Sequence, residues 1–346
     1  MFGFSPEFRV FAGIYYKSME MTINLAALRR NADAIIKRSG TALCAVVKCN
    51  AYGHGDIECA LALRDKAECF AVADISEALR LVGGGIKNDI LILSDMYDEK
   101  GYPENLIFTA FDELSLMRLL RSGRKFALKA DTGMHRLGFD PLQCANIIPL
   151  LPVKKIHSVF THIYDTSAAR DQAELFSFLT RALPVKKHIF ASNFSLCTSS
   201  AGDYVRCGIA LYGYGSENLE KVMSLDARVL RVCKVLPGDN IGYGIFRAQK
   251  AANIATLDIG YGDGFMRKAP GERRSVAING QKCNVAGQVC MDMMMAEVAD
   301  GVKSGDHAEI LGATLTARHH ALEWNTNEYE VLVSLGHSRA RRKYIN

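Results

Sequence analysis

The sequence predicts an α/β protein in which a (β/α)8 barrel of the TIM type is followed by a β-rich C-terminal domain. Three observations lead to this prediction. From about residue 41 to 212, short apolar runs alternate with segments of helical spacing, as in proteins built from βα units. There are eight such runs, which is the number of strands in a closed barrel. After about residue 225, short runs are separated by turn signals such as PGD, NGQ and SGD instead of helices.

The apolar runs are close to continuously hydrophobic, which is typical of parallel strands buried on both faces. They cover residues 43–48, 69–74, 90–95, 106–111, 126–131, 156–162, 188–193 and 204–208. Helix-like segments such as ISEALRLVGGG and DQAELFSFLTRAL stand between most of them, and several end in glycine, a common helix terminator. The stretch between the third and fourth runs is too irregular to predict a helix. An open doubly wound sheet is the competing architecture, but no GxGxxG follows the first run, so we favour the barrel.

The change of rhythm near residue 225 suggests the domain boundaries. We predict an N-terminal extension of unclear role over residues 1–20, the barrel over residues 21–225 and the β-rich domain over residues 226–346. Runs such as NIATLDIG and MMMAEV, each followed by a turn signal, are typical of a β domain. The segment MTINLAALRRNADAIIKRS indicates a strand and then a helix, which could join either domain.

Composition and charge argue against several classes of protein. The 346 residues include 42 Lys or Arg and 37 Asp or Glu, a formal net charge of +5, so we expect no nucleic-acid partner. The apolar runs have the length of strands, so we expect no membrane span. Ten scattered cysteines without a CxxC pair predict free thiols in a reducing, cytoplasmic compartment and no metal site. The first residues do not resemble an export signal.

A lysine that closes the first barrel run is the leading candidate for chemistry. Reactive groups of such barrels lie at the carboxyl ends of the strands, and AVVKCNAYGHG (45–55) places Lys48 there, with Tyr52 in the loop beyond. Partial desolvation lowers the pKa of a lysine and makes it a nucleophile or Schiff-base former. From its position alone, a solvated lysine at a strand end is an equally open interpretation.

The motif around Lys48 strongly resembles the pyridoxal-phosphate (PLP) lysine motif of the alanine racemases, which are barrel-type (fold-type III) PLP enzymes. Further blocks resemble that family in its chain order: FALKADTGMHRLGF (126–139), VFTHI (159–163), YVRCGIALYG (204–213), IGYGIFRA (241–248), IGYGDGFMR (259–267), VAGQVCMDMMMAEV (285–298) and NEYEVL (327–332). The resemblance covers roughly residues 20–343. It implies a racemase that interconverts L-alanine and D-alanine and supplies D-alanine for peptidoglycan.

The resemblance also implies roles for the matched residues. Lys48 would bind PLP and act as one catalytic base, and Tyr243, supplied by the partner subunit of a homodimer, would be the base on the opposite face. Arg206 would hydrogen-bond the pyridine nitrogen of PLP, with His162 beside it. Because a guanidinium keeps its proton, the ring nitrogen would then stay largely unprotonated.

Substrate and phosphate sites are implied in the same way. Arg136 would bind the substrate carboxylate, and a carbamylated Lys129 would pair with it; the alternative is an unmodified lysine satisfied by another acid or a bound anion. Tyr261 would line the substrate channel. Met291 and Asp292 of the partner subunit would complete the pocket. The phosphate would be bound by Tyr52, by Ser192 or Ser195, and by the backbone amides of Gly208 and Ile209.

The chain departs from the family pattern in three places. Following the seventh run, ASNFSLCTSS leaves the choice between two serines open. In THIYDTSAARD the loop acid is Asp165, shifted behind the bulky Tyr164. Near the C-terminus, His337 or Ser338 stands where the family commonly has a tyrosine, which could widen or re-polarise the pocket.

Two alternative functions therefore stay open. One is a racemase of broader specificity, or a serine racemase, on the same fold. The other is a non-catalytic PLP-binding protein, although such proteins lack a second domain that would carry Tyr243. Amino-acid decarboxylases share the barrel and the cofactor, but the set of Lys48, Tyr243 and Arg206 is the racemase set.

Overall fold

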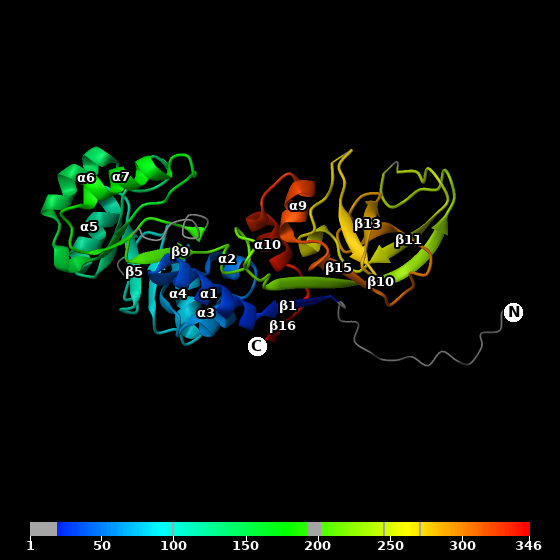
Figure 1. Cartoon of the computed structure of the whole chain (residues 1–346), viewed down its shortest axis with the longest axis horizontal. Helices are drawn as coiled ribbons and strands as arrows, with labels where there is room; N and C mark the ends of the chain where they lie inside the picture. The colour runs from blue at the N-terminus through cyan, green and yellow to red at the C-terminus, as the bar shows by residue number, and fades with distance from the viewer. Residues whose placement is uncertain (1–18, 99, 193–201, 245, 270) are drawn as a thin grey trace. The chain divides into compact units, whose positions relative to one another are not determined.

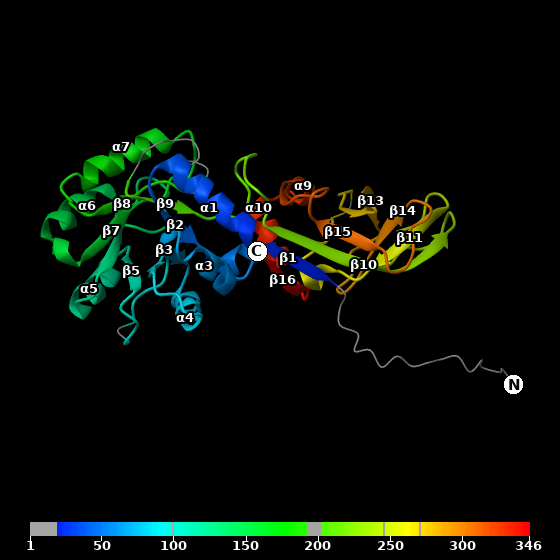
Figure 2. The ribbon, with the colours of Figure 1, turned by 60° about the horizontal axis from the view of Figure 1, so that its bottom comes forward.

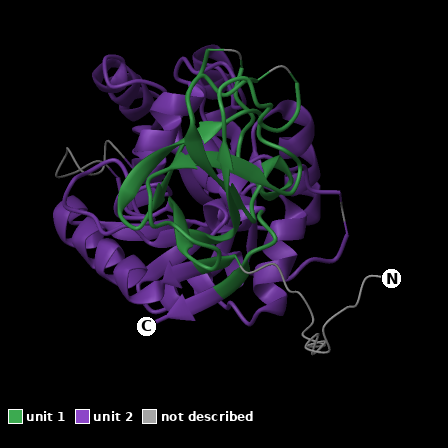
Figure 3. Ribbon diagram, turned by 90° about the vertical axis from the view of Figure 1, so that its right-hand side faces the viewer, with its two compact units in different colours: residues 1–21, 225–310, 338–342 green, residues 22–224, 311–337, 343–346 purple. Residues whose placement is uncertain are grey.

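The computed structural model describes residues 19–98, 100–192, 202–244, 246–269 and 271–346. The chain divides into two compact units, coloured in Figure 3. Unit 2 comprises Thr22–Ser224, Leu311–His337 and Lys343–Asn346; unit 1 comprises the described residues up to Met21, Leu225–Ile310 and Ser338–Arg342. The predicted N-terminal extension falls almost entirely outside the described residues.

Unit 2 is built on a parallel sheet of eight strands (Figures 1 and 2). The strands are β2 (Ala42–Val46), β3 (Ala67–Val72), β4 (Asp89–Ile92), β5 (Leu106–Ala110), β6 (Phe126–Lys129), β7 (Ile156–Phe160), β8 (Lys186–His188) and β9 (Tyr204–Cys207). Their order is β8-β7-β6-β5-β4-β3-β2-β9. A parallel bridge between Ala191, just after β8, and Arg206 of β9 joins the two edges of the sheet and closes the barrel. The predicted barrel is confirmed, and each strand begins within two residues of its predicted run.

Helices alternate with the strands, and several of them end at a glycine, as the sequence predicts. They are α1 (Leu25–Ser39), α3 (Asp56–Leu63), α4 (Ile75–Gly83), α5 (Glu113–Ser122), α6 (Pro141–Ile147) and α7 (Ala169–Thr180), with single 3₁₀ turns η1 (Ile148–Leu150) and η2 (Val153–Lys155). The side chains of Asn24, Asp74, Asp112 and Asp140 each accept a backbone N–H in the first turn of the following helix, which satisfies donors that a helix start leaves free. The described residues between β4 and β5 form no helix.

Unit 2 also contains a segment from late in the chain. Residues 311–337 carry α9 (Ala317–Trp324) and α10 (Glu328–Gly336), which pack on each other. The backbones of α10 and of the loop after β2 approach so closely that a Cβ on Gly53 would lie 2.7 Å from the Cα of Gly336. The sequence-based boundary between residues 225 and 226 stays a prediction.

Unit 1 holds the antiparallel strands. These are β10 (Met223–Val235), β11 (Ala252–Leu257), β12 (Ser275–Ile278), β13 (Gln281–Ala286), β14 (Met294–Val298) and β15 (His307–Leu311), with the 3₁₀ turn η3 (Tyr261–Asp263). The sheet order is β11-β14-β13-β12-β15-β10-β1-β16, where β1 is Glu20–Asn24 and β16 is Arg341–Ile345. Alternating burial along β14 places one face of the sheet in a core. The predicted β-rich C-terminal part is confirmed.

Within the described part of the chain, none of the helices combines the length and the apolar character that crossing a membrane requires.

Candidate active site

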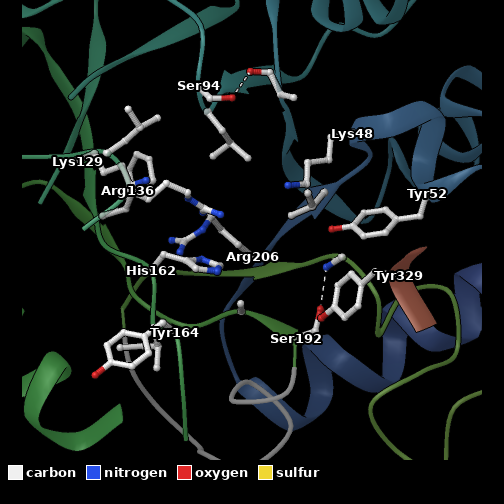
Figure 4. A pocket seen from close by; sticks show the side chains of 18 residues that line it. Lys48, Tyr52, Ser94, Lys129, Arg136, His162, Tyr164, Ser192, Arg206 and Tyr329 are labelled. Atoms are coloured by element: carbon white, nitrogen blue, oxygen red, sulfur yellow. Dashed lines mark hydrogen bonds between the residues drawn. The ribbon is translucent and has the colours of Figure 1, made fainter. Parts of the chain in front are cut away.

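A cavity of ≈ 520 Å³ lies at the carboxyl ends of the barrel strands (Figure 4). Its walls include residues at or just after the ends of β2, β3, β6, β7 and β9, which is where barrels of this type bind their ligands. Four of the described lining residues are cationic. No Asp or Glu is found among the described lining residues. The cations are Lys48, Lys129, Arg136 and Arg206. Such a lining favours an anionic ligand.

Lys48 lies just after the end of strand β2 and immediately before a left-handed turn. Strand β2 ends at Val46, and the next element, α2 (Lys48–Tyr52), has φ angles of 53° to 54° at Cys49, Asn50, Ala51 and Tyr52. Residues other than glycine adopt this conformation at a cost of roughly 1–3 kcal/mol each and keep it only where their surroundings impose it. The strained turn therefore needs partners.

Glu77 of α4 supplies one such partner and joins the turn to the neighbouring strand. One carboxylate oxygen accepts the backbone N–H of Cys49 at 2.6 Å, and the other accepts that of Ala73 at 2.8 Å. The carboxylate is 7 % exposed, and charged, buried acceptors form strong hydrogen bonds. Glu77 thus ties the residue after Lys48 to the end of β3.

Tyr52, Ser192 and Gly208 form a cradle at one side of the cavity. A Cβ on Gly208 would lie 2.3 Å from Tyr52 Oη, so only glycine leaves room for that hydroxyl. Ser192 Oγ accepts the N–H of Gly208 at 2.9 Å and that of Ala210 at 3.4 Å. Hydroxyls and backbone amides that converge on a cationic cavity suit a phosphate group.

Two further groups are predicted to bind the phosphate, the backbone amide of Ile209 and the side chain of Ser195. Ile209 is buried but does not line the cavity, and Ser195 lies outside the described residues. Tyr329 of α10, which the sequence analysis did not single out, lines the cavity with its ring centroid 5.9 Å from that of Tyr52. Neither His337 nor Ser338 lines it.

Arg206 is buried in the barrel and held through its two terminal nitrogens. Nη1 donates to His188 Nδ1 and to the His188 carbonyl, both at 2.8 Å. Nη2 donates to the carbonyls of Thr161 at 2.5 Å and Ile189 at 3.3 Å. Burial lowers the pKa of Arg206 to about 10, so the guanidinium stays charged at neutral pH.

The two histidines beside Arg206 are neutral. His162 lines the cavity, and burial, together with the charge of Arg206, lowers its pKa to about 3. Burial and Arg206 likewise hold the pKa of His188 well below its usual range. His188 also stacks on Phe160, with ring centroids 4.8 Å apart. Between these two neutral rings, Arg206 carries a positive charge that is permanent at neutral pH.

Lys129 and Arg136 both line the cavity, as the sequence analysis expects. Lys129 is 6 % exposed. Burial, followed by the positive charges of Arg136 and Arg206, lowers the pKa of its ammonium group to about 8. A substantial neutral fraction is therefore present in a slightly alkaline solution. Of the two loop residues that depart from the family pattern, Tyr164 lines the cavity and Asp165 does not.

The remaining predicted site residues lie in unit 1, and none of them lines this cavity. Tyr243 is 72 % exposed, Met291 56 % and Tyr261 39 %. Arg339 fixes the loop that carries Asp292: it pairs with the Asp292 carboxylate at 2.8 Å and with that of the buried Asp263 at 2.7 Å. The N–H of Tyr261 donates to the Cys290 carbonyl at 2.9 Å, so the two loops hold each other.

Three residues of the site escaped the sequence analysis: Glu77, His188 and Tyr329. Glu77 is the third residue of its helix, where an acid is ordinarily a capping residue, and His188 opens a predicted strand. Tyr329 belongs to the block NEYEVL, which was noted without a role for the tyrosine. The described residues contain no group of three His, Cys, Asp or Glu side chains placed to hold a metal ion.

A barrel whose strand ends surround a lysine, an anion cradle and a buried arginine defines the class of (β/α)8 enzymes that bind a phosphorylated cofactor. Residues 23–216 match the family described as alanine racemase, N-terminal domain, and residues 222–344 match alanine racemase, C-terminal domain. The chain belongs to the alanine racemase family.

Individual relatives agree with this assignment. The chain is 34% identical over 362 residues to an alanine racemase of Yersinia pestis, with 95% of this chain and 99% of the relative covered. It is 32% identical over 353 residues to one of Neisseria meningitidis serogroup B, with coverage of 95% and 99%. Among solved structures, alanine racemase from Acinetobacter baumannii matches with a TM-score of 0.86 at 27% identity, covering 95% of this chain and 100% of that chain. Alanine racemase from Bartonella henselae with covalently bound pyridoxal phosphate matches with a TM-score of 0.85 at 28% identity, covering 95% and 99%.

Proposed function

We propose that this chain is a PLP-dependent racemase that interconverts L-alanine and D-alanine. The observation that carries the proposal is the cavity at the barrel mouth, in which Lys48 and three further cations face an anion cradle with no carboxylate among the described lining residues. The family to which the chain belongs supports the same activity. Production of D-alanine for peptidoglycan is the corresponding biological role.

The residues present fit PLP. Only glycine at position 208 leaves the space beside the Tyr52 hydroxyl, and the Ser192 hydroxyl and the Gly208 amide lie at the same place. These groups would hold the phosphate, and Lys48 would hold the aldehyde carbon. Arg206 would face the pyridine nitrogen, because its described hydrogen bonds run through Nη1 and Nη2 and leave Nε for a ligand.

When bound, PLP makes the α-proton of an amino acid acidic by delocalising the electron pair left behind. The protein then has to remove a proton on one face and deliver one on the other. Lys48 Nζ would do so on its own face, and the Tyr243 hydroxyl on the opposite face. Arg206 stays charged at neutral pH and would donate a hydrogen bond to the ring nitrogen without protonating it.

Arg136 would bind the substrate carboxylate, which holds the α-carbon between the two bases. We propose that Lys129 is carbamylated. The amine that reacts with carbon dioxide is the neutral one, which the lowered pKa of about 8 makes available. A carbamate would also place a negative charge beside Arg136, where an ammonium group would repel it. Mass spectrometry of the intact protein at neutral pH would detect the added mass, which acid would remove.

We propose that the active unit is a homodimer with two composite sites. Tyr243, Met291 and Asp292 would complete the cavity of the partner subunit, and Tyr261 would line the channel that leads to it. The support is their exposure: Tyr243 and Met291 are a large aromatic and an apolar side chain that unit 1 leaves open to solvent. In this proposal the barrel domain (21–225) binds PLP, and the part of the domain 226–346 that belongs to unit 1 serves the neighbouring barrel. Ten scattered cysteines without a CxxC pair favour a reducing compartment such as the cytoplasm.

The test is racemisation of single enantiomers by the purified protein. We expect L-alanine to become racemic, with a cofactor absorbance that Lys48→Ala removes and the exposed Lys37→Ala keeps. L-serine and L-lysine in parallel assays separate a broader racemase from an alanine-specific one. Bound cofactor without D-alanine would favour a non-catalytic PLP protein and would overturn the proposal.

A further inference from the structure

A hydrogen-bonded chain crosses unit 2 from the buried arginine to the other end of the barrel. His188 Nε2 lies 3.0 Å from Ser158 Oγ, Ser158 Oγ lies 3.1 Å from His157 Nδ1, and His157 Nε2 lies 3.2 Å from Asp89 Oδ2. With the Arg206 Nη1 contact to His188 Nδ1 at 2.8 Å, four contacts join five side chains.

The chain is buried in its middle and reaches solvent at its far end. Ser158 is 0 % exposed, His188 1 % and Arg206 4 %. The side chain of His157 is 14 % exposed, and that of Asp89, the first residue of β4, is 48 % exposed. Buried polar groups are stable only when each donor meets an acceptor, so the arrangement of protons within the chain is constrained.

Both ends of the chain determine that arrangement. Arginine can only donate, so His188 Nδ1 must accept and the proton of this neutral ring must sit on Nε2. An ionised carboxylate can only accept, and the contact with His157 holds the pKa of Asp89 below its usual range. His157 Nε2 therefore donates to Asp89.

Ser158 lies between the two rings. Its Oγ accepts from His188 Nε2 at 3.0 Å and also contacts His157 Nδ1 at 3.1 Å. The Nε2 proton of His188 therefore has a buried acceptor, which is itself held in place by His157 and Asp89. This contact fixes the orientation of the His188 ring, whose Nδ1 faces Arg206.

We propose that Ser158, His157 and Asp89 are positioning residues for Arg206, which they hold against the cofactor ring by fixing the orientation of the His188 ring. This inference rests on the proposed function for what Arg206 contacts, but the arrangement of protons does not depend on it. The three residues touch neither the cavity nor the substrate; they act through His188.

The test combines nuclear magnetic resonance of ¹⁵N-histidine in the PLP-loaded enzyme with kinetics and cofactor absorbance. The variant is Ser158→Ala, which removes the central link, and Ser158→Thr restores the hydroxyl. Thr109→Val is the matched control, because its buried hydroxyl donates to the Ile92 carbonyl at 2.6 Å outside the chain. The His188 signal is assigned by its loss in His188→Gln.

Arg206 keeps the His188 proton on Nε2 in every variant. In the wild type and in Ser158→Thr we expect the signal of a hydrogen-bonded Nε2–H. In Ser158→Ala this proton loses its acceptor, so its signal should shift and exchange faster with water, and the absorbance of the bound cofactor should shift. The kcat for alanine should fall roughly fivefold, the value of one hydrogen bond, with an unchanged KM because the substrate contacts remain. His157→Phe, at a partly exposed position, should produce the same changes to a smaller degree and serves if Ser158→Ala does not fold.

Retention of the wild-type His188 Nε2–H signal, absorbance and kcat in Ser158→Ala or His157→Phe, as in Thr109→Val, would overturn the inference. Failure of the proposed function has a different signature: the wild type itself would not bind PLP or would not racemise alanine. In that case the His188 Nε2–H signal in wild type and variants still decides whether the contacts hold the ring.

Discussion

The barrel and unit 1 hold their candidate functional groups in opposite ways. In the barrel, Arg206 is 4 % exposed, Lys129 is 6 % exposed, and both face a cavity built by one chain. In unit 1, Tyr243 is 72 % and Met291 56 % exposed, and backbone hydrogen bonds from Tyr261 and Gly262 hold the loop of Met291 in place. One set lines a cavity within the chain, and the other is exposed, as the proposed homodimer requires. The difference explains why a single chain would carry two incomplete halves of a site.

The largest expected effect tests the exposed half. Tyr243→Phe removes the hydroxyl proposed to act as a base, so racemisation should fall roughly 10²- to 10⁴-fold while the absorbance of bound PLP is kept. In deuterated water, exchange of the α-proton should persist for the enantiomer that faces Lys48 and disappear for the other. Tyr102→Phe, which loses a surface hydrogen bond to Asp98, is the control. Equal exchange of both enantiomers in Tyr243→Phe would remove this residue from the mechanism.

The second effect tests the buried half through its pH dependence. Burial lowers the pKa of Lys129 from 10.5 to about 8. Between pH 8 and pH 10.5 the unfolded chain binds more protons at Lys129 than the folded chain does. The contribution of Lys129 to the free energy of unfolding therefore rises with pH. Below pH 8 the buried ammonium destabilises the fold by at most about 3 kcal/mol, and this cost fades toward pH 10.5.

Urea unfolding in buffer free of carbon dioxide measures the free energy of unfolding of Lys129→Met and of the wild type. The variant should have its largest stability advantage over the wild type near pH 7. Its advantage should shrink as the pH rises from 8 to 10.5. An advantage that grows with pH would show that the lysine is not buried as a free amine. Addition of bicarbonate should stabilise only the wild type if the lysine is carbamylated.

The third effect tests the support of the strained turn. Glu77→Gln keeps one side-chain oxygen that accepts a backbone N–H and places an NH₂ group opposite the other backbone N–H. The expected loss in the free energy of unfolding is about 1–3 kcal/mol. The melting temperature should fall and PLP should be lost more readily, because Lys48 and Tyr52 belong to that turn. Glu113→Gln, at the exposed start of α5, should change neither. A Glu77→Gln protein as stable as wild type would show that the turn has other supports.

The smallest effect concerns the cradle. Gly208→Ala would place a methyl group 2.3 Å from Tyr52 Oη, so the tyrosine must move. PLP affinity should fall roughly tenfold, as expected for overpacking of a close contact. Gly83→Ala, where nothing lies within 4 Å of the added Cβ, should bind PLP normally. Dialysis followed by measurement of cofactor absorbance gives the PLP affinity of both variants. Equal affinities of Gly208→Ala and Gly83→Ala would show that the phosphate binds elsewhere.

Much of the barrel could be predicted because buried parallel strands are apolar runs whose starts are visible in the sequence. Lys48, Lys129, Arg136, His162 and Arg206 could be assigned from motifs, and the structure places all five around one cavity. Glu77 and His188 could not, because their significance lies in contacts across strands: an acid in a helix that meets the amide of Cys49, and a ring that meets Arg206. The left-handed turn was also missed, since Cys49, Ala51 and Tyr52 have no local preference for positive φ.

Mixing two inactive variants tests the division of labour between the two regions most directly. Homodimers of Lys48→Ala and of Tyr243→Phe should each be inactive. When they are unfolded together, refolded at equal amounts and supplied with PLP, half of the dimers combine the two chains, and each such dimer has one site with both wild-type groups. The account predicts recovery of about a quarter of the wild-type activity. No recovery, in a mixture shown to contain the mixed dimer, would contradict it and would mean that Lys48 and Tyr243 do not act from different subunits.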